Sequence, residues 1–315
     1  MNSFPKGHTT YNGEIDDFVS RRYRVIMRLS KGGTSEIFKA VDTSNKALVV
    51  IKILPSHYLS SDERMEIDNS KGKTLDISHR IIEKSSEFMI QEANFLKNCR
   101  HPNMVRLLDH DLEARRPYII LNYLGNITLE KEILNSPVNF SIKRTLDILK
   151  QLCAALGYIH KRGFVYCDIK PSNIILRNKK FTLIDFGLVR PIGMEVSGGT
   201  IGYMAPEILQ CENGQALASP AMDIYSLGIL LYELLTGFHP LASQKVYDVN
   251  NHYYFDTQSI TDTEKTPHSA SHLNPFLPNA FNRILLKCIN KDPENRYQKV
   301  ESLLNDFEKE AAKYI

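Results

Sequence analysis

The sequence lacks the long apolar runs that would place it in a membrane or mark it for export. No stretch of 18 apolar residues occurs, and the best candidate, residues 227–235, is short and contains Glu233. A helix needs about 20 apolar residues to cross a bilayer, so we expect no membrane span. The first 28 residues are polar and charged and contain no apolar core, so we expect no signal peptide.

Paired cysteines are also lacking. The chain has five cysteines, an odd number, and no two of them form a C-x-x-C pair. This spacing argues against a disulfide scaffold and against a zinc ribbon. We therefore expect a reducing compartment and a cytoplasmic location.

Neither sign of charge dominates. Lys and Arg number 39 against 36 Asp and Glu, which leaves a net charge of +3. That excess is too small to predict a nucleic acid or an anionic membrane surface as a partner. The chain is 43% hydrophobic and 24% charged over 315 residues, values typical of a globular protein with about two domains, or one domain with two lobes.

The first 125 residues read mostly as strands. Segments rich in β-branched and apolar residues are separated by Gly, Asn and Asp, a pattern that predicts short strands. The predicted strands are residues 23–29, 36–42, 47–54, 105–109 and 118–122. One helix is expected among them, at about residues 86–98, where apolar residues recur at helical spacing.

After Gly125 the pattern becomes helical. Leu149, Leu152, Leu156 and Ile159 form one stripe, with Gly163 as the expected C-cap. Two short strands are predicted at residues 174–176 and 181–185, and further helices at 222–236, around 281–288 and at 300–312. Residues 222–236 are apolar almost all round, so that helix should be buried. The prediction is an α+β protein of two lobes, with a hinge near residues 122–126.

Two polar stretches, residues 56–85 and 243–272, look like insertions. The simplest interpretation is a solvated loop or an amphipathic surface piece. The first insertion directly precedes the expected helix at residues 86–98, so it is a candidate docking site for a regulator. A passive surface loop remains the alternative.

Lys52 and Glu92 are both charged residues in apolar patterns. Lys52 lies in the predicted strand 47–54, and Glu92 lies between Phe88 and Phe95 on the inward stripe of the predicted helix. A buried charge is costly without a partner of opposite sign. We therefore predict an ion pair between Lys52 and Glu92, although a lysine that extends to water from a strand edge is an alternative for Lys52.

Asp168, Lys170 and Asn173 lie together in a predicted loop, and Asp185 follows an apolar strand. An Asp and an Asn on adjacent loops can hold Mg²⁺ through oxygen ligands, while substrate phosphates and water complete its shell. Turns capped by Asp or Asn side chains would give either cluster without any such function.

The order and spacing of these motifs resemble the eukaryotic-type (Hanks-type) serine/threonine protein kinase family, over roughly residues 23–297. The segment at residues 29–37 resembles the Gly-rich loop that covers the phosphates. The Asp185-Phe186-Gly187, Ala205-Pro206-Glu207 and Asp223 to Gly228 motifs follow in the family's order. Lys170 and Thr200 resemble the Ser/Thr branch of the family.

The resemblance implies a bilobal protein-kinase-like fold, with a small strand-rich N-lobe that holds one helix and a larger, mainly helical C-lobe. It implies an N-terminal extension at residues 1–22, an N-lobe at 23–122, a hinge and C-lobe at 123–315, and one kinase domain over about 23–310. It also implies ATP as the phosphate donor, Mg²⁺ (or Mn²⁺) as the metal, and proteins with Ser or Thr as substrates.

Site residues follow from the same resemblance. Asp168 corresponds to the catalytic base and Lys170 to the residue that steadies the phosphoryl group, while Asn173 and Asp185 correspond to the metal ligands. Glu207 is expected to pair with Arg296. The residues expected to bind or frame the nucleotide are Leu29, Ser30, Lys31, Gly32, Gly33, Thr34, Ser35, Glu36, Ile37, Lys52, Glu92, Leu121, Asn122 and Leu124.

Several positions depart from the family pattern. Ser30 and Ser35 replace two glycines of the Gly-rich loop, Tyr166 replaces a histidine, and Cys167 replaces the arginine that grips an activation-loop phosphate. Cys167 therefore predicts activity that does not require activation-loop phosphorylation. Two other functions stay open: a kinase-fold scaffold with little catalysis, and a small-molecule phosphotransferase, although the latter group lacks the Ala205-Pro206-Glu207 segment.

Overall fold

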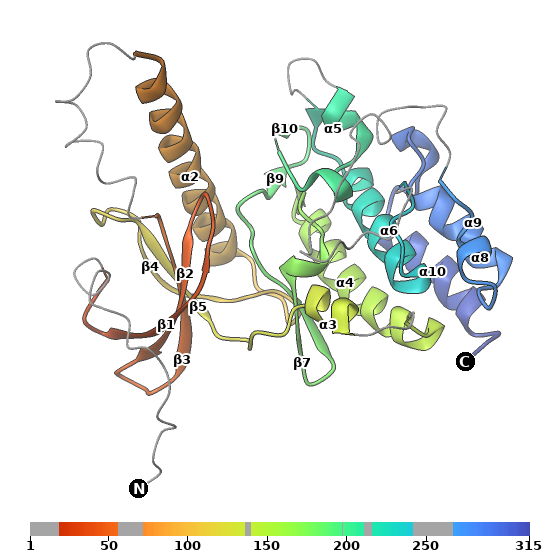
Figure 1. Cartoon of the computed structure of the whole chain (residues 1–315), viewed down its shortest axis with the longest axis horizontal. Coiled ribbons are helices and arrows are strands. Elements are labelled where there is room, and N and C mark those ends of the chain that lie inside the picture. The colour runs from red at the N-terminus through yellow and green to blue at the C-terminus, as the bar shows by residue number, and fades with distance from the viewer. Residues whose placement is uncertain (1–18, 56–71, 136–139, 197, 211–215, 242–266) are drawn as a thin grey trace, which may run out of the picture. The chain divides into compact units, whose positions relative to one another are not determined.

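The computed structural model describes residues 19–55, 72–135, 140–196, 198–210, 216–241 and 267–315, with the backbone alone for residues 72–83 (Figure 1). The chain divides into two compact units, one within Met1–Arg100 and Val105–Leu124 and the other within His101–Met104 and Gly125–Ile315. None of the helices in the described ranges combines the length and the apolar character that crossing a membrane requires.

The first unit is built on a five-stranded antiparallel sheet in the order β1-β2-β3-β5-β4 (Figure 1). Its strands are β1 (Tyr23–Lys31), β2 (Glu36–Asp42), β3 (Leu48–Ile53), β4 (Leu107–Asp111) and β5 (Tyr118–Asn122). Buried residues alternate along β2 and β3, so Phe38, Ala40, Ile51 and Ile53 meet on one face and form its core. The predicted bounds of β2 and β5 are confirmed, whereas β4 begins two residues later than expected.

Helix α2 (Gly72–Asn98) differs from its prediction. We expected a helix only from about residue 86, and a loop or surface piece before it. The helix instead begins at Gly72, so much of the supposed insertion continues α2. The physical reason is that residues 73–85 contain no proline and include Lys, Arg and Glu, which are good helix formers. Residues 56–71 lie outside the described residues.

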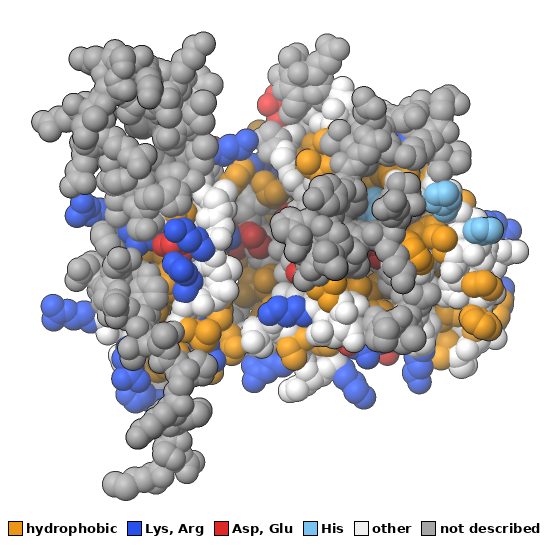
Figure 2. Space-filling view, in the orientation of Figure 1, with side chains coloured by type: hydrophobic (Ala, Val, Ile, Leu, Met, Phe, Trp, Pro, Cys, Tyr) orange, Lys and Arg blue, Asp and Glu red, His pale blue; other side chains and the backbone are white. Residues whose placement is uncertain are grey.

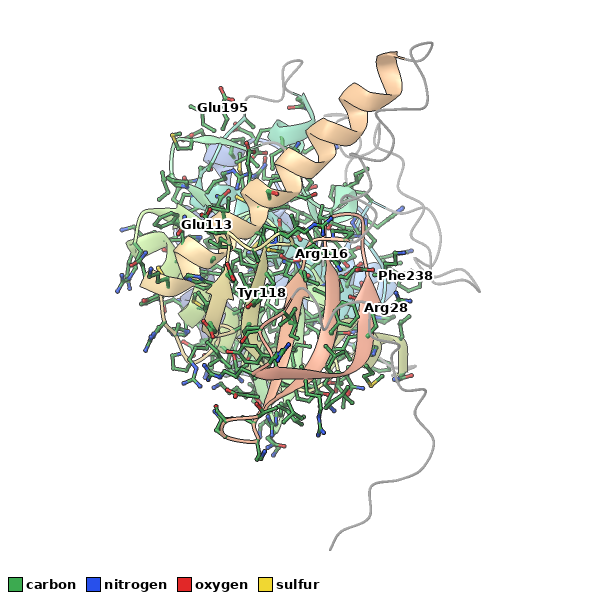
Figure 3. All side chains as sticks on the ribbon, turned by 90° about the vertical axis from the view of Figure 1, so that its left-hand side faces the viewer. Arg28, Glu113, Arg116, Tyr118, Glu195 and Phe238 are labelled. Carbon is green, nitrogen blue, oxygen red and sulfur yellow. The ribbon has the colours of Figure 1, made fainter. Side chains whose placement is uncertain are left out.

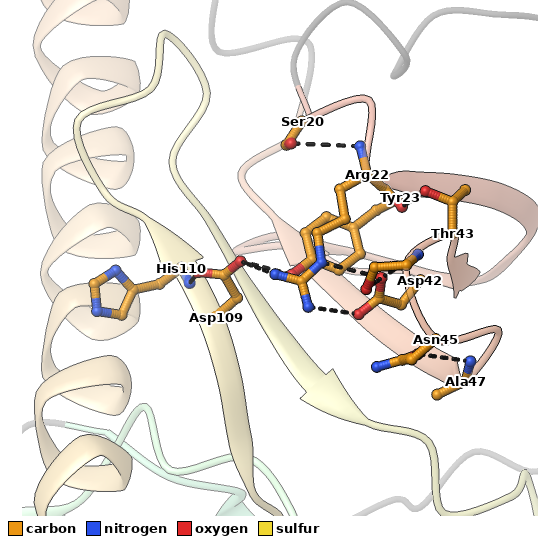
Figure 4. A network of polar contacts seen from close by, with 10 residues as sticks. Ser20, Arg22, Tyr23, Asp42, Thr43, Asn45, Ala47, Asp109 and His110 are labelled. Atoms are coloured by element: carbon orange, nitrogen blue, oxygen red, sulfur yellow. Dashed lines mark hydrogen bonds and ion pairs between the residues drawn. The ribbon is translucent and has the colours of Figure 1, made fainter.

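A polar network ties the start of β1 to the far end of β2 (Figure 4). Arg22 makes two hydrogen bonds with Asp42, from Nε to Oδ1 at 3.0 Å and from Nη2 to Oδ2 at 2.7 Å. The Tyr23 hydroxyl donates to Asp109 on β4 at 2.6 Å. Hydrogen bonds from Arg22 hold the pKa of Asp42 well below its usual range, so this carboxylate stays charged at neutral pH.

The second unit is mainly helical and is centred on α6 (Pro220–Thr236). All but the first residue of α6 are buried, as its apolar sequence predicted, and it ends at Gly237, whose left-handed φ of 75° suits glycine. A Cβ added at Gly228 would lie 2.4 Å from the Cβ of Cys288. Glycine at this position therefore lets α6 pack closely on α9 (Asn279–Cys288).

Helices α4 (Ile142–Lys161) and α10 (Val300–Ala311) pack against each other in the same unit. The left-handed φ of 81° at Gly163 follows the end of α4, close to the expected cap. The remaining α-helices of the described part are α3 (Leu129–Asn135), α5 (Pro206–Gln210) and α8 (Ala270–Leu273), and short 3-10 helices cover Pro171–Asn173, Ile201–Tyr203 and Pro293–Asn295. On the face drawn in Figure 2, most Lys and Arg side chains lie singly among neutral and apolar ones.

Three short antiparallel pairs of strands complete the second unit. They are β6 (Phe164–Val165) with β9 (Arg190–Pro191), β7 (Ile174–Arg177) with β8 (Lys180–Leu183), and β10 (Glu195–Val196) with β11 (Ala216–Leu217). The β7–β8 turn is two residues long, and Asn178 and Lys179 both have positive φ, as a tight type I′ hairpin requires. Strand β8 ends at Leu183 and not at the expected Asp185, because Asp185 takes a left-handed φ of 63°.

Candidate active site

The Gly-rich segment forms the connection between β1 and β2. Lys31 pairs with Glu36 across the two strands, and the Gly32 N–H donates to the Ser35 carbonyl at 2.9 Å. The side chains of Leu29, Ser30, Lys31 and Thr34 are exposed, whereas Ser35 is buried and Ile37 is half-buried. Neither serine has a positive φ, so serine adopts this backbone without strain.

Lys52 and Glu92 form the ion pair that the sequence predicted. Lys52 Nζ lies 2.6 Å from Glu92 Oε2, and the Glu92 side chain is fully buried. The pair joins β3 to α2 and so orients the ammonium group. The role of these residues in binding ATP remains a prediction.

The expected hinge residues lie at and just beyond the end of β5. Leu121 is buried, while Asn122 and Leu124 are half-buried. The Asn122 side chain accepts a hydrogen bond from the Arg106 N–H at 2.6 Å, so its polar group is used within the sheet. The Glu36 side chain is only 3% exposed and bonds to Arg116, while its expected role beside the nucleotide stays a prediction.

The second unit brings Asp168, Lys170 and Asn173 together around one carboxylate. Asp168 Oδ2 lies 2.8 Å from Lys170 Nζ and accepts from Asn173 Nδ2 at 2.7 Å. Asp168 Oδ1 accepts from the Thr200 hydroxyl at 2.9 Å, and Lys170 Nζ in turn donates to that hydroxyl at 2.7 Å. Three polar side chains from two segments of the chain, those of Lys170, Asn173 and Thr200, thus fix the position of the Asp168 carboxylate.

The Asp223 side chain supports this loop by accepting hydrogen bonds from the loop's backbone. Its carboxylate is fully buried at the start of α6 and accepts hydrogen bonds from the N–H groups of Tyr166 and Cys167, both at 2.9 Å. His160 Nε2 lies 2.8 Å from the same carboxylate. Cys167 has a left-handed φ of 67°, an uncommon conformation for a residue with a side chain, which such contacts can hold in place.

Asn173 and Asp185 come together because they flank the β7–β8 hairpin. Asn173 directly precedes β7, and Asp185 follows β8 after one residue, Ile184, whose N–H donates to the Asn173 carbonyl at 2.9 Å. Asn173 uses its amide nitrogen on Asp168, which leaves the amide oxygen as its donor for a metal. The Asp185 side chain is exposed.

These two donors fit a magnesium ion. In the described part of the chain, no three His, Cys, Asp or Glu side chains are grouped to hold a metal by themselves. Mg²⁺ does not need such a cage, since it commonly takes one or two protein oxygen ligands and completes its shell with water and substrate phosphates. Mn²⁺ also accepts oxygen ligands and is an alternative.

The segment from Asp185 to Glu207, which the resemblance identifies as the activation segment, is held at its end by a second predicted pair, Glu207 with Arg296. The guanidinium donates to both carboxylate oxygens, at 2.8 and 2.7 Å, and Arg296 is buried. Bidentate pairs of this kind are among the stronger hydrogen-bonded contacts in proteins. The contact therefore ties α5 to the segment that precedes α10.

Comparison with known proteins identifies the class. The model of the protein kinase domain family matches residues 23–307, so the chain belongs to this family. The strand-rich sheet of the first unit and the helices of the second agree with the α+β fold that was predicted.

Named relatives come from bacteria. A probable serine/threonine-protein kinase of Clostridium acetobutylicum is 28% identical over 312 residues, which cover 96% of this chain and 42% of the relative. Serine/threonine-protein kinase PrkC of Bacillus subtilis is 28% identical over 297 residues, covering 92% of this chain and 40% of the relative. Serine/threonine-protein kinase PknB of Mycolicibacterium smegmatis is 27% identical over 303 residues, which cover 92% of this chain and 43% of the relative. The chain thus spans about two-fifths of the length of these relatives.

Some residues with structural roles at the site were not among the predicted site residues. Thr200 had indicated the Ser/Thr branch, but its contacts with Asp168 and Lys170 were not foreseen. Asp223 had marked the start of a buried helix, and an acid at that point is the only sequence signal of its role as an anchor. No feature of the sequence indicated that Arg116 is buried, since an arginine in a polar turn normally faces water.

Proposed function

We propose that this domain is a protein kinase that transfers the γ-phosphate of ATP to Ser or Thr hydroxyls of proteins. The observation that carries the proposal is the cluster of Lys170, Asn173 and Thr200 around the Asp168 carboxylate. Phosphoryl transfer depends on positioning and on electrostatic stabilisation. A carboxylate fixed by several partners suits the first need, and a nearby ammonium group suits the second.

Each residue has a distinct task in this proposal. Asp168 orients the substrate hydroxyl and accepts its proton. Lys170 places a positive charge beside the transferred group, and the Thr200 hydroxyl keeps Lys170 and Asp168 in register through its contacts with both. In the first unit, Lys52 provides a positive charge for the phosphates, and Glu92 holds it in position.

Asn173 and Asp185 are the proposed magnesium ligands. When bound, the metal neutralises charge on the β- and γ-phosphates. Asn173 is suited to this because its contact with Asp168 orients its amide group. Asp185 contributes the negative charge.

The direct test compares the wild-type protein with Asp168→Asn, using labelled ATP, Mg²⁺ and a generic basic protein as substrate. Asparagine keeps the shape of the side chain but cannot accept the proton. We expect phosphate transfer to fall by about 10²–10⁴-fold, the usual contribution of a general base, while ATP affinity stays near that of the wild type. Mass spectrometry should locate the phosphates on Ser and Thr. Full turnover by the variant, or phosphate on a small molecule only, would contradict the proposal.

We further propose that the activity does not require phosphorylation of the activation loop. At the position where the family pattern has arginine, Cys167 is buried, and burial raises the pKa of its thiol well above the usual value, so it carries no charge at neutral pH. Backbone contacts supply an alternative support. The β10–β11 ladder and the hydrogen bonds between Gly193 and Ala218 (2.9 Å) and between Ala218 and Met194 (2.8 Å) hold the segment.

Phosphatase treatment tests this second proposal. The treated wild-type protein, and a Ser197→Ala variant, should keep their activity within about tenfold, equivalent to about 1.4 kcal/mol of barrier. Ser197 itself lies outside the described residues. A larger loss would indicate that another basic residue, such as Arg190, binds a phosphate there.

We also propose protein substrates as the partners, a cytoplasmic location, and residues 56–85 as a docking site for a regulator. The support for the last is that α2 carries Glu92 and continues from this stretch. Replacing residues 62–73 by a short Gly/Ser link should change activity or partner binding in pull-downs. No change in either would contradict a docking role for this stretch.

A further inference from the structure

The first unit contains a buried ion pair that the proposed reaction does not use. Arg116 is 1% exposed and Glu36 is 3% exposed, and Arg116 is among the largest fully buried side chains of the described residues. Removing a guanidinium and a carboxylate from water is costly, and an apolar pair often fills the same space with equal or greater stability. Stability alone is therefore a weak explanation for this pair.

Arg116 contacts two different strand ends from the turn between β4 and β5. Its Nη2 donates to Glu36 Oε2 at 2.8 Å, and its Nε donates to the Leu54 carbonyl at 2.9 Å. Nη2 also donates to that carbonyl. One planar guanidinium thus holds Glu36 and Leu54 together in a fixed geometry that lysine cannot reproduce. Arg116 and Arg28 are labelled in Figure 3.

Both strand ends adjoin groups that face the phosphates in the proposed reaction. Glu36 is the first residue of β2 and directly follows the Gly-rich turn at residues 32–35. Leu54 directly follows β3, in which Lys52 lies two residues earlier. Glu36 also pairs with Ile53 across the strands, so the two ends lie side by side in the sheet.

Glu36 receives a second arginine on its outer side. Arg28 Nη1 lies 3.8 Å from Glu36 Oε1, and the Arg28 side chain is 44% exposed. Arg28 belongs to β1, the other strand that leads into the Gly-rich turn. The Glu36 carboxylate therefore links β1, β2 and the β4–β5 turn at the base of this turn.

We propose that Arg116 is a positioning residue for the ATP phosphates. It fixes the end of the Gly-rich turn, through Glu36, and the end of the strand that carries Lys52, through Leu54, without contacting ATP itself. The inference rests on the proposed ATP-dependent activity, because only a phosphate ligand would sense both elements. It predicts that loss of the fork weakens the recognition of phosphates more than that of the adenosine moiety.

The matched control lies at the opposite end of β2. Arg22 also holds a carboxylate of β2, since two of its nitrogens donate to Asp42, and Asp42 is the last residue of the strand whose first residue is Glu36. Arg22→Lys removes a guanidinium fork from the same sheet, at a more exposed position far along β2 from the Gly-rich turn. A comparison with Arg116→Lys thus separates positioning from a general loss of sheet stability.

The experiment measures the affinities of the wild type, Arg116→Lys and Arg22→Lys for ATP and for adenosine by calorimetry, together with kcat and KM for ATP and for the protein substrate. The wild type must first bind ATP and phosphorylate protein, and failure there would refute the proposed function itself. We expect Arg116→Lys to bind ATP at least about tenfold more weakly, with adenosine affinity and the protein KM unchanged. Arg22→Lys should match the wild type for both ligands.

Equal losses of ATP and adenosine affinity in Arg116→Lys, or no loss of either, would overturn the proposal. Should Arg116→Lys fail to fold, Glu36→Gln provides the second variant. It retains an acceptor for the guanidinium but removes the charge, and it should show the same selective loss for ATP to a smaller degree. A Glu36→Gln protein that is folded and binds both ligands like the wild type would equally overturn the inference.

Discussion

The two units hold their functional groups in different ways. In the first unit the support is ionic: Lys52 rests on Glu92, and the base of the Gly-rich turn rests on Glu36 and Arg116. In the second unit the backbone N–H groups of the Asp168 loop donate to the buried Asp223 carboxylate, in addition to the ion pair between Lys170 and Asp168. Cys167, directly before Asp168, and Asp185, the proposed metal ligand, both have a left-handed φ.

This difference matches the tasks proposed for the two units. The attraction between two paired charges changes only gradually when they shift slightly. Such pairs therefore suit groups that attract a flexible triphosphate. Proton and phosphoryl transfer are far less tolerant, since a misplacement of about 1 Å can cost about 10²-fold in rate. A carboxylate whose loop is held through the backbone of the two preceding residues gains that accuracy. The comparison predicts that charge-neutralising substitutions will affect mainly binding in the first unit and mainly turnover in the second.

Among substitutions of the supporting residues, Asp223→Asn should have the largest effect. The amide provides one acceptor where the carboxylate provides two, so a buried N–H of Tyr166 or Cys167 loses its partner, at a cost of about 1–3 kcal/mol in the free energy of unfolding. Movement of the loop should lower kcat by about 10²-fold while ATP affinity changes little. Urea unfolding and steady-state kinetics measure the two effects. Unchanged kcat in a folded variant would show that Asp168 does not depend on this anchor.

Glu92→Gln tests the ionic support of the first unit. Glutamine keeps the shape but removes the charge beside Lys52, so we expect ATP affinity to fall by about tenfold, or about 1.4 kcal/mol. The control is Glu113→Gln, which removes an exposed charge from the β4–β5 turn of the same unit and should change nothing. Calorimetry with ATP measures both. A kcat loss without an affinity loss would break the comparison between the units.

Glu233 extends the comparison, because it is a buried acid in the second unit that accepts a hydrogen bond from a tyrosine hydroxyl. The Tyr203 hydroxyl lies 2.6 Å from Glu233 Oε2, and burial raises the pKa of this carboxyl to about 8. The folded protein therefore keeps a proton that the unfolded chain releases above its ordinary pKa. The contribution of protonated Glu233 to the free energy of unfolding is therefore fully present at low pH and is lost as the pH rises from about 4.5 to about 8.

Glu233→Gln should remove this dependence. Below pH 5 the two proteins should differ little, and the stability of the variant relative to the wild type should rise with pH, by at most about 1.4 kcal/mol per unit. Thermal or urea unfolding between pH 5 and pH 8 measures it. A wild type whose advantage over the variant grew with pH would show that the carboxylate is charged in the folded state.

The double variant Ser30→Gly and Ser35→Gly should have the smallest effect. Both serines occupy backbone conformations open to any residue, so glycine relieves no strain there. ATP should bind equally or slightly more tightly, by less than about threefold, a free-energy change well under 1 kcal/mol. Markedly weaker binding would mean that the serine hydroxyls contact the nucleotide or support the turn.

Local signals were enough to predict much of the fold. Segments rich in β-branched and apolar residues located β2 and β5 at their observed bounds, and an all-round apolar segment ending at Gly237 located the buried α6. Two charged pairs were also foreseen, Lys52 with Glu92 and Glu207 with Arg296. In the first pair each charge interrupts an apolar pattern, a local sign that a partner must exist. The second followed from the family resemblance.

The tertiary structure alone decided the rest. Nothing near Arg116 in the sequence distinguishes it from an arginine in a solvated turn, and its partners Glu36 and Leu54 lie 80 and 62 residues away. It becomes buried only because the β4–β5 turn meets the ends of β2 and β3. Likewise, Asp223 becomes the anchor of the Asp168 loop through contacts that span 56 and 57 residues. Periodicity and turn chemistry are written into neighbouring residues, whereas the partner of a buried polar group is set by chain segments that meet only when the protein folds.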